Sequence, residues 1–233
     1  MTVTIEVFSS ADDWSEACAE RLASALSEGL STNNKALFAG AGGSTPSPIY
    51  QRLAQADLDW SKVAVTLVDE RHVPESSPDS NARLMRETLL TGPAAAARFI
   101  PLHHAAATVD RAAALAARAL EAEGPLDAVL LGMGEDGHIC SMFPGSPTLK
   151  TLLTTALEPA VFGVPPGRDG MAPPQERISL NIPYLARARR VVLALTGAKK
   201  RAVFEAEATG DPAVQPIAAL IASGAPLEVL WTE

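Results

Sequence analysis

His138 lies in a glycine-rich segment, GMGEDGHICSMFPG (residues 132–145), that directly follows a run of apolar residues. An imidazole titrates near neutral pH, and a positioned histidine acting as a general base accelerates a reaction about 10²–10⁴-fold. Asp136 could accept a hydrogen bond from the ring and fix its tautomer, and the neighbouring glycines would let a substrate approach closely. The segment therefore indicates a general base facing a bound molecule. The alternative is a loop histidine satisfied by backbone groups.

Other chemistries fit this segment poorly. Its glycines match the dinucleotide fingerprint G-x-G-x-x-G, but Pro144 and Pro147 interrupt the helix that a pyrophosphate site needs. Cys140 suggests a thiolate nucleophile, for which a small buried residue is the alternative. No serine lies in a G-x-S-x-G elbow, and the four histidines lack the spacing of zinc ligands. We therefore expect non-covalent chemistry without a metal or a cofactor.

The segment GAGGSTP (residues 40–46) has the composition of an anion-binding turn between a strand and a helix. Its glycines allow close approach of the backbone, and Ser44 and Thr45 offer hydroxyls and can cap the helix. The segment lacks the lysine of a nucleotide P-loop, so a monophosphate fits better than a triphosphate. The alternative is a capped tight turn without a ligand.

Two further segments carry cations. DERHVP (residues 69–74) places Arg71 beside two carboxylates at a strand end, and a guanidinium suits phosphate or carboxylate. TGAKK (residues 196–200) places Lys199 and Lys200 at a strand-to-helix turn. Alone, these segments are typical of a surface ion-pair cluster and a solvated basic turn. Together with residues 43–45, they predict a convergent anion pocket, from which His72 is left out as a bystander.

The elements that must position these segments alternate between strand and helix. This alternation predicts an α/β fold: a mostly parallel sheet with helices on both faces, in a Rossmann-like three-layer sandwich. Ligands bind such sheets beyond the carboxyl ends of the strands, where all four polar segments fall. The expected strands are residues 4–9, 35–40, 62–70, 126–134, 189–197 and 226–233, and the expected helices are residues 11–29, 47–56, 81–90, 110–123 and 199–210.

Residues 145–183 break this rhythm because they are dense in proline and glycine. We expect a small excursion or lid over the strand ends, within a single domain that spans residues 1–233. Gly163, Gly167 and Gly170 would permit closure of residues 163–176 over a substrate, but the sequence does not decide whether they close.

Composition limits the function classes. A formal net charge of −8 argues against a surface that binds nucleic acid, but not against a small anion held by two or three cations. No apolar run approaches the roughly 20 residues that span a bilayer. Two cysteines give no disulfide framework, and the first residues have no secretory signal, so we expect a cytoplasmic protein. We expect no membrane or nucleic-acid partner, and a monomer or weak homodimer.

Four segments in order resemble the 6-phosphogluconolactonase family, within the superfamily of sugar-phosphate isomerases and deaminases. They are AGAGGSTPSPIY, VDERHVPESSPDSN, LLGMGEDGHICSMFPGSP and RISLNIPYLARARRVVLALTGAKK. The resemblance covers nearly the whole chain and implies hydrolysis of 6-phospho-D-glucono-1,5-lactone to 6-phosphogluconate, in the oxidative pentose phosphate pathway. Ile139 departs from it, because these lactonases more often have threonine there.

The resemblance also implies roles for individual residues. His138 would take a proton from the attacking water, and Asp136 would orient or tune the ring. Arg71, Arg177 and Lys200 would hold the phosphate or stabilise the oxyanion, without a division of those duties. The remaining members of the implied substrate-binding set are Gly42, Gly43, Ser44, Thr45 and Asp69.

Two rival functions are disfavoured. Glucosamine-6-phosphate deaminases resemble this chain at DGHI, but they continue with Ala-Phe-Asn-Glu-Pro, so Phe143 replaces the glutamate that supports their ring-opening histidine. They also usually have tyrosine where this chain has Arg71. A sugar-phosphate sensor of the transcription-regulator type would need a DNA-reading module, and the sequence has no helix-turn-helix and no basic excess.

Overall fold

A sheet of parallel strands forms the centre of the protein in the computed structural model, which describes residues 3–167 and 174–233. The strand order is β1-β10-β9-β6-β2-β3-β5, and every neighbouring pair is parallel. The predicted α/β architecture is therefore confirmed. The strands are β1 (Ile5–Phe8), β2 (Ala36–Gly40), β3 (Val63–Leu67), β5 (Arg98–Phe99), β6 (Ala128–Leu131), β9 (Arg190–Thr196) and β10 (Leu227–Thr232).

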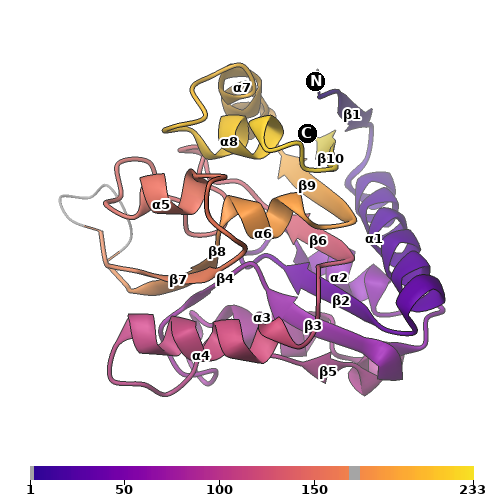
Figure 1. Ribbon diagram of the computed structural model, residues 1–233. Helices are drawn as coiled ribbons and strands as arrows, with labels where there is room; N and C mark the ends of the chain where they lie inside the picture. The colour runs from indigo at the N-terminus through magenta and orange to yellow at the C-terminus, as the bar shows by residue number, and fades with distance from the viewer. Residues whose placement is uncertain (1–2, 168–173) are drawn as a thin grey trace.

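Helices cover both faces of this sheet (Figure 1), as the alternation predicts. The long helix α1 lies on one side and contacts β2, β6, β9 and β10, while α5, α6 and α8 lie on the other. Among the described residues, no helix is both long and apolar enough to cross a membrane. The helices are α1 (Ala11–Asn33), α2 (Ser47–Leu53), α3 (Asn81–Thr88), α4 (Val109–Glu121), α5 (Leu149–Leu153), α6 (Ile182–Ala186), α7 (Ala198–Glu207) and α8 (Pro216–Ala222), with 3-10 turns at Trp60–Lys62 and Gly92–Ala96.

The boundaries of α1 follow from its capping residues. Ser10 accepts a hydrogen bond from the backbone N–H of Asp13 at 3.0 Å, which satisfies one of the free donors at the helix start. The helix continues past the predicted end at residue 29 to Asn33, where the left-handed Asn34 ends it and donates its backbone N–H to the carbonyl of Leu30. Trp14, Cys18, Leu22 and Leu26 are buried against the sheet, as the helical spacing predicts.

The structure corrects the prediction of one continuous strand over residues 62–70. The apolar run divides at Val68: β3 stays in the parallel sheet, and β4 (Asp69–Arg71) joins a second, antiparallel sheet of order β4-β8-β7. The other strands of this sheet are β7 (Val161–Val164) and β8 (Arg177–Leu180). The described residues of the excursion at 145–183 form α5, β7, β8 and the start of α6, and they extend the fold. Residues 168–173, in the middle of the candidate lid 163–176 and including Gly170, lie outside the described residues.

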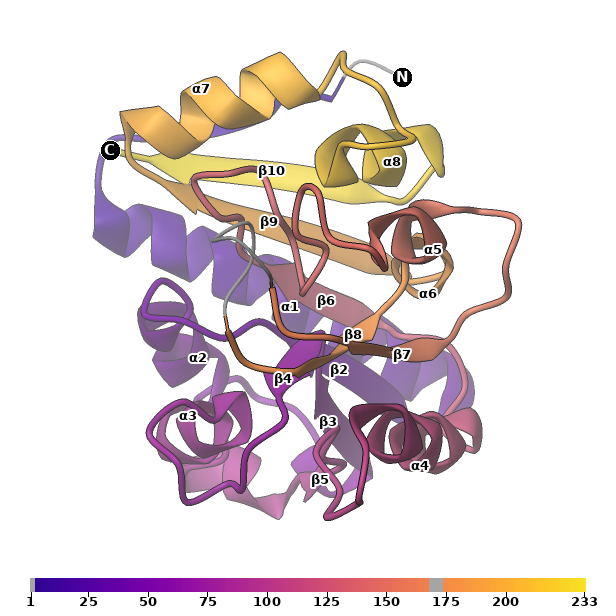
Figure 2. The same cartoon turned by 90° about the vertical axis from the view of Figure 1, so that its left-hand side faces the viewer.

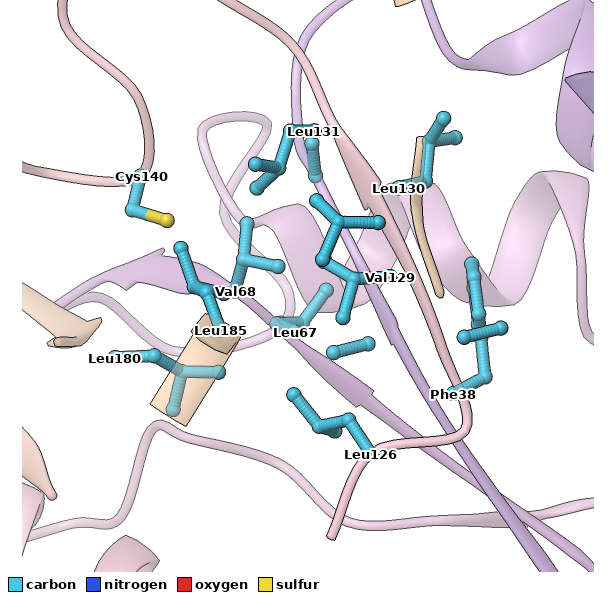
Figure 3. Packing of buried hydrophobic residues seen from close by; sticks show 14 of the residues in the cluster. Phe38, Leu67, Val68, Leu126, Val129, Leu130, Leu131, Cys140, Leu180 and Leu185 are labelled. Atoms are coloured by element: carbon cyan, nitrogen blue, oxygen red, sulfur yellow. The ribbon is translucent and has the colours of Figure 1, made fainter. Parts of the chain in front are cut away.

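The core is continuous between the two sheets. Figure 3 shows Leu67 and Val129 of the parallel sheet in the same apolar layer as Val68, which joins β3 to β4, and as Leu180 of β8 and Leu185 of α6. Burying a side chain of this size contributes roughly 1.5–3 kcal/mol, so this layer fixes the small sheet on the large one. Its firm attachment matters because β4 and β8 carry charged residues to the carboxyl ends of β2 and β6.

Candidate active site

A cavity of about 270 Å³ lies at the carboxyl ends of the parallel strands. It is bounded by the segments after β2 and β6, by the start of α7 after β9, and by the facing strands β4 and β8. Of the residues to which the resemblance assigns a role, all but Asp136 line it. The lining residues are Ala41, Gly42, Gly43, Ser44, Thr45, Asp69, Arg71, Asn81, Gly132, Met133, Gly134, His138, Cys140, Arg177 and Lys200.

His138 and Asp136 form a hydrogen-bonded pair at one wall of this cavity. The ring Nδ1 of His138 lies 2.5 Å from Oδ1 of Asp136, so we assign the proton on Nδ1 to this bond. The ring then keeps an unprotonated Nε2, the atom that a general base needs. The bond from His138 lowers the pKa of Asp136, and Asp136 therefore stays ionised as a partner for the ring.

The backbone around His138 holds the ring in place. The N–H of Gly134 donates to the carbonyl of His138 at 2.8 Å, closing a tight turn. A β-carbon at Gly134 would lie 2.2 Å from Nδ1 of His138, so glycine is required for the ring to fold back over the turn. The ring also packs on Phe143, with centroids 4.5 Å apart. The imidazole is consequently oriented on two sides, although its side chain remains 29% exposed.

Two arginines face the cavity from adjacent strands. Arg71 of β4 and Arg177 of β8 are direct cross-strand partners, an arrangement in which like charges repel. The Nε–H groups of both arginines are buried and have no hydrogen-bond partner in the described structure. Burial lowers the pKa of Arg177, and the charge of Arg71 lowers it further. Paired cations with free donors are typical of a site that binds an anion.

Asp69 is more strongly engaged with protein than with the cavity. Its Oδ2 accepts a hydrogen bond from the hydroxyl of Ser141 at 2.5 Å and lies 3.8 Å from Nη1 of Arg177. The side chain is buried. These contacts join β4 to the segment after β6 and to β8. We therefore expect Asp69 to hold Arg177 and the His138 loop in register.

The turn at residues 41–45 corrects the expectation that Ser44 or Thr45 caps the next helix. Pro46 occupies the N-cap position of α2, and no side chain caps it. The hydroxyls of Ser44 and Thr45 are thus not used in capping and belong to residues that line the cavity. A β-carbon at Gly42 would lie 1.9 Å from the side-chain oxygen of Asn81. The backbone at position 42 therefore lies too close to Asn81 for any residue other than glycine.

The two lysines at the start of α7 separate in space. Lys200 lines the cavity, whereas Lys199 forms an ion pair with Glu135. The prediction that both join the anion pocket is therefore wrong for Lys199. His72 also has a partner that the sequence does not suggest, because its Nδ1 lies 3.1 Å from a carboxylate oxygen of Glu176. It is not among the residues that line the cavity.

Asn81 was missed as a site residue by reasoning from the sequence, and Phe143 was singled out only as the residue that stands where the deaminases have a supporting glutamate. Asn81 lines the cavity and donates to the backbone carbonyl of Asp69 at 2.9 Å, and Phe143 packs under both His138 and Arg177. A polar residue at the start of a helix after DERHVP is a signal that could indicate Asn81. The resemblance suggests that position 143 lies near His138, whereas nothing in the sequence indicates the contact of Phe143 with Arg177, which comes from a separate segment.

Cys140 is part of the core. Figure 3 shows its side chain directed toward Val68, and it is 8% exposed. Burial and then the charge of Asp69 raise the pKa of the thiol well above its usual value, which disfavours the thiolate that a nucleophile needs. Within residues 3–167 and 174–233, no group of three or more His, Cys, Asp or Glu side chains is placed to hold a metal ion.

Glu70 supports Arg71 by fixing the segment that follows it. The carboxylate is fully buried and accepts hydrogen bonds from the backbone N–H groups of Arg71, Asn81 and Ala82 and from the hydroxyl of Ser80. Burial raises its pKa, and these four donors oppose that rise. Glu70 thereby joins β4 to the start of α3.

We expect Glu70→Gln to lower the free energy of unfolding by about 1–3 kcal/mol, because an amide NH₂ would face a buried N–H donor. Urea denaturation monitored by circular dichroism measures this change. Glu75→Gln is the matched control, since the exposed Glu75 pairs with Arg86 at the surface, and its effect should stay within about 0.5 kcal/mol. Equal effects of the two substitutions would contradict the structural role of Glu70.

Comparisons with known proteins identify the family. Residues 9–231 match the family described as glucosamine-6-phosphate isomerases/6-phosphogluconolactonase. A 6-phosphogluconolactonase of Caulobacter vibrioides is 39% identical over 99% of this chain and 98% of its own length, and one of Rhizobium meliloti is 39% identical over 99% of both. The crystal structure of a 6-phosphogluconolactonase from Shewanella baltica superposes with a TM-score of 0.91, at 34% identity over 100% of this chain and 98% of that one. The chain belongs to the family of glucosamine-6-phosphate isomerases and 6-phosphogluconolactonases.

Proposed function

We propose that this protein hydrolyses 6-phospho-D-glucono-1,5-lactone to 6-phosphogluconate, with His138 as the general base. One observation carries the proposal: a hydrogen-bonded histidine–aspartate pair and two arginines with free N–H donors line the same cavity. The first arrangement activates water, and the second binds a phosphate or an oxyanion. The lactonase names of the full-length relatives agree with this chemistry.

The reaction begins with a water molecule between Nε2 of His138 and the lactone carbonyl. The water oxygen bonds to the carbonyl carbon as its proton passes to Nε2, which gives a tetrahedral oxyanion and an imidazolium. Asp136 stabilises this imidazolium through the bond to Nδ1. The oxyanion then collapses, the bond from carbon to ring oxygen breaks, and the imidazolium returns the proton to that oxygen. No covalent enzyme intermediate or metal is required.

The cations supply the binding energy and charge stabilisation. Arg177 packs on the Phe143 ring that also contacts His138, with its guanidinium carbon 5.4 Å from the ring centroid. We infer that Arg177 stabilises the oxyanion, whereas Arg71, Lys200 and the 42–45 turn hold the phosphate. Water-excluded N–H donors of this kind are effective because they are already oriented before charge develops.

Deamination of glucosamine 6-phosphate fits the cavity less well. The resemblance places Phe143 where the deaminases have a glutamate, and in this protein an apolar ring packs directly against the histidine. A phenyl ring cannot accept the proton that a carboxylate would take. The neighbourhood of His138 therefore supports proton transfer with water. In the part of the chain that the structure describes, Asp136 is the carboxylate bonded to the ring, and Phe143 is its apolar neighbour.

A direct assay tests the proposed function. Freshly generated 6-phosphogluconolactone hydrolyses slowly by itself, so acid release is followed in a pH-stat with and without the protein. We expect clear acceleration, and we expect no ammonia when the protein is mixed with glucosamine 6-phosphate. Ammonia release without accelerated lactone hydrolysis would replace the lactonase assignment by the deaminase one. Absence of both activities would reject the proposal.

A further inference from the structure

Glu207, the last residue of α7, lies directly behind the turn that carries Asp136 and His138. A β-carbon built at Gly137 would lie 1.8 Å from Oε1 of Glu207, so the carboxyl group packs on the α-carbon of Gly137. Gly137 also has a φ of +85°, which other residues rarely adopt. The glutamate therefore has no side chain between itself and the backbone that joins Asp136 to His138. In Figure 2, α7 lies beside β9 and β10 at one edge of the parallel sheet.

The surroundings of this carboxyl group are unusual. Glu207 is 8% exposed, and its Oε2 is buried without a hydrogen-bond partner in the part of the chain that the structure describes. Burial raises the pKa of Glu207, the backbone of Ile217 opposes this, and the charge of Asp136 raises it again. A buried polar atom without a partner is rare in folded proteins, and it calls for a functional explanation.

The charges around His138 supply that explanation. The groups that face the ring from the cavity side are Arg71 on β4, Arg177 on β8 and Lys200 on α7, all of which line the same cavity. Cations disfavour a second positive charge, so they oppose the imidazolium that forms when His138 accepts a proton. Asp136, which is bonded to Nδ1, favours the imidazolium, and the carboxyl group of Glu207 lies against Gly137, between Asp136 and His138 in the chain.

We propose that Glu207 is a positioning residue for the His138–Asp136 pair: it supports the turn through Gly137, and its negative charge makes His138 a stronger base. The inference rests on the proposed function, because it assumes that His138 takes a proton during the reaction. Removal of the charge should weaken the base while leaving the cavity itself intact.

The test measures the titration of the His138 ring by NMR in the free protein, and His138→Asn assigns its signal among those of the four histidines. In Glu207→Gln, the titration midpoint of His138 should fall by roughly half a pH unit, since a nearby negative charge is lost. Glu205→Gln is the matched control, because it removes an equal charge from an exposed position on the same helix, paired with Arg201. Equal midpoints in the two variants would overturn the proposal.

Kinetics provide the second readout. The acidic limb of the pH profile of kcat/KM should shift by the same amount as the NMR midpoint in Glu207→Gln, and a uniform loss at every pH would indicate only a structural role and reject the proposal. Glu207→Leu, which removes both the charge and the unpaired oxygen, should give the same shift if the glutamine variant fails to fold. A shifted NMR midpoint in a protein without lactonase activity would reject the proposed function, while equal midpoints in an active lactonase would reject only the role of Glu207.

Discussion

Replacing His138 by alanine is expected to lower kcat for lactone hydrolysis by about 10²–10⁴-fold, the contribution of a positioned general base. The fold should survive because the side chain is partly exposed, and its backbone carbonyl still accepts the hydrogen bond from Gly134. Binding of the product should also persist, because the arginines and Lys200 remain in place. Stopped-flow or pH-stat rates measure the loss, and calorimetry measures binding of 6-phosphogluconate.

His103→Ala is the control for this substitution. His103 lies against His72, with ring centroids 5.3 Å apart, and does not line the cavity. Its replacement should leave kcat and KM within a factor of about two, since substitutions away from the site change little. If His138→Ala retained full activity with an unchanged pH profile, water activation would have to be assigned to another group.

The alternation of strands and helices was predictable because each parallel strand here is an apolar run bounded by polar turns. Residues 35–40 and 189–197 show this clearly, and both form central strands. The division of residues 62–70 was not predictable, since Val68 is as apolar as the residues before it. Only the pairing of β4 with β8, more than a hundred residues further along the chain, decides where one sheet ends and the other begins.

The positions of the site residues could also be predicted only in part. Parallel strands point their carboxyl ends to one edge, so the convergence of residues 42–45, His138 and Lys200 could be expected from the pattern alone. The sequence could not predict which of the two adjacent lysines faces the cavity. Neighbouring residues on a helix point roughly 100° apart, so the residue at which α7 starts decides which lysine side chain is directed to the cavity. The burial of Glu70 beneath α3 likewise depends on contacts that have no periodic signal.

The second large effect is expected at Arg177. Glutamine at this position should lower kcat/KM by about 10²–10³-fold, mostly through kcat, because it removes a preorganised donor to the oxyanion. The geometry supports a loss in kcat, since Arg177 shares the Phe143 ring with His138 and its Nε–H has no partner in the described protein. Arg71→Gln should instead act mainly on KM, because we assign Arg71 to the phosphate.

Two companion variants separate charge from geometry at Arg177. Arg177→Lys keeps a positive charge but loses the planar fork, so it should recover only part of the lost rate. Arg187→Gln is the control, because this exposed arginine pairs with Glu158 and does not line the cavity. Arg177 lies 3.8 Å from the carboxylate of Asp69, and each of its substitutions changes this contact. Thermal unfolding of each variant measures whether the change destabilises the fold. A folded Arg177→Gln enzyme with unchanged kcat would show that oxyanion stabilisation comes from other donors, with Lys200 and the backbone N–H groups of the 42–45 turn as the next to be tested.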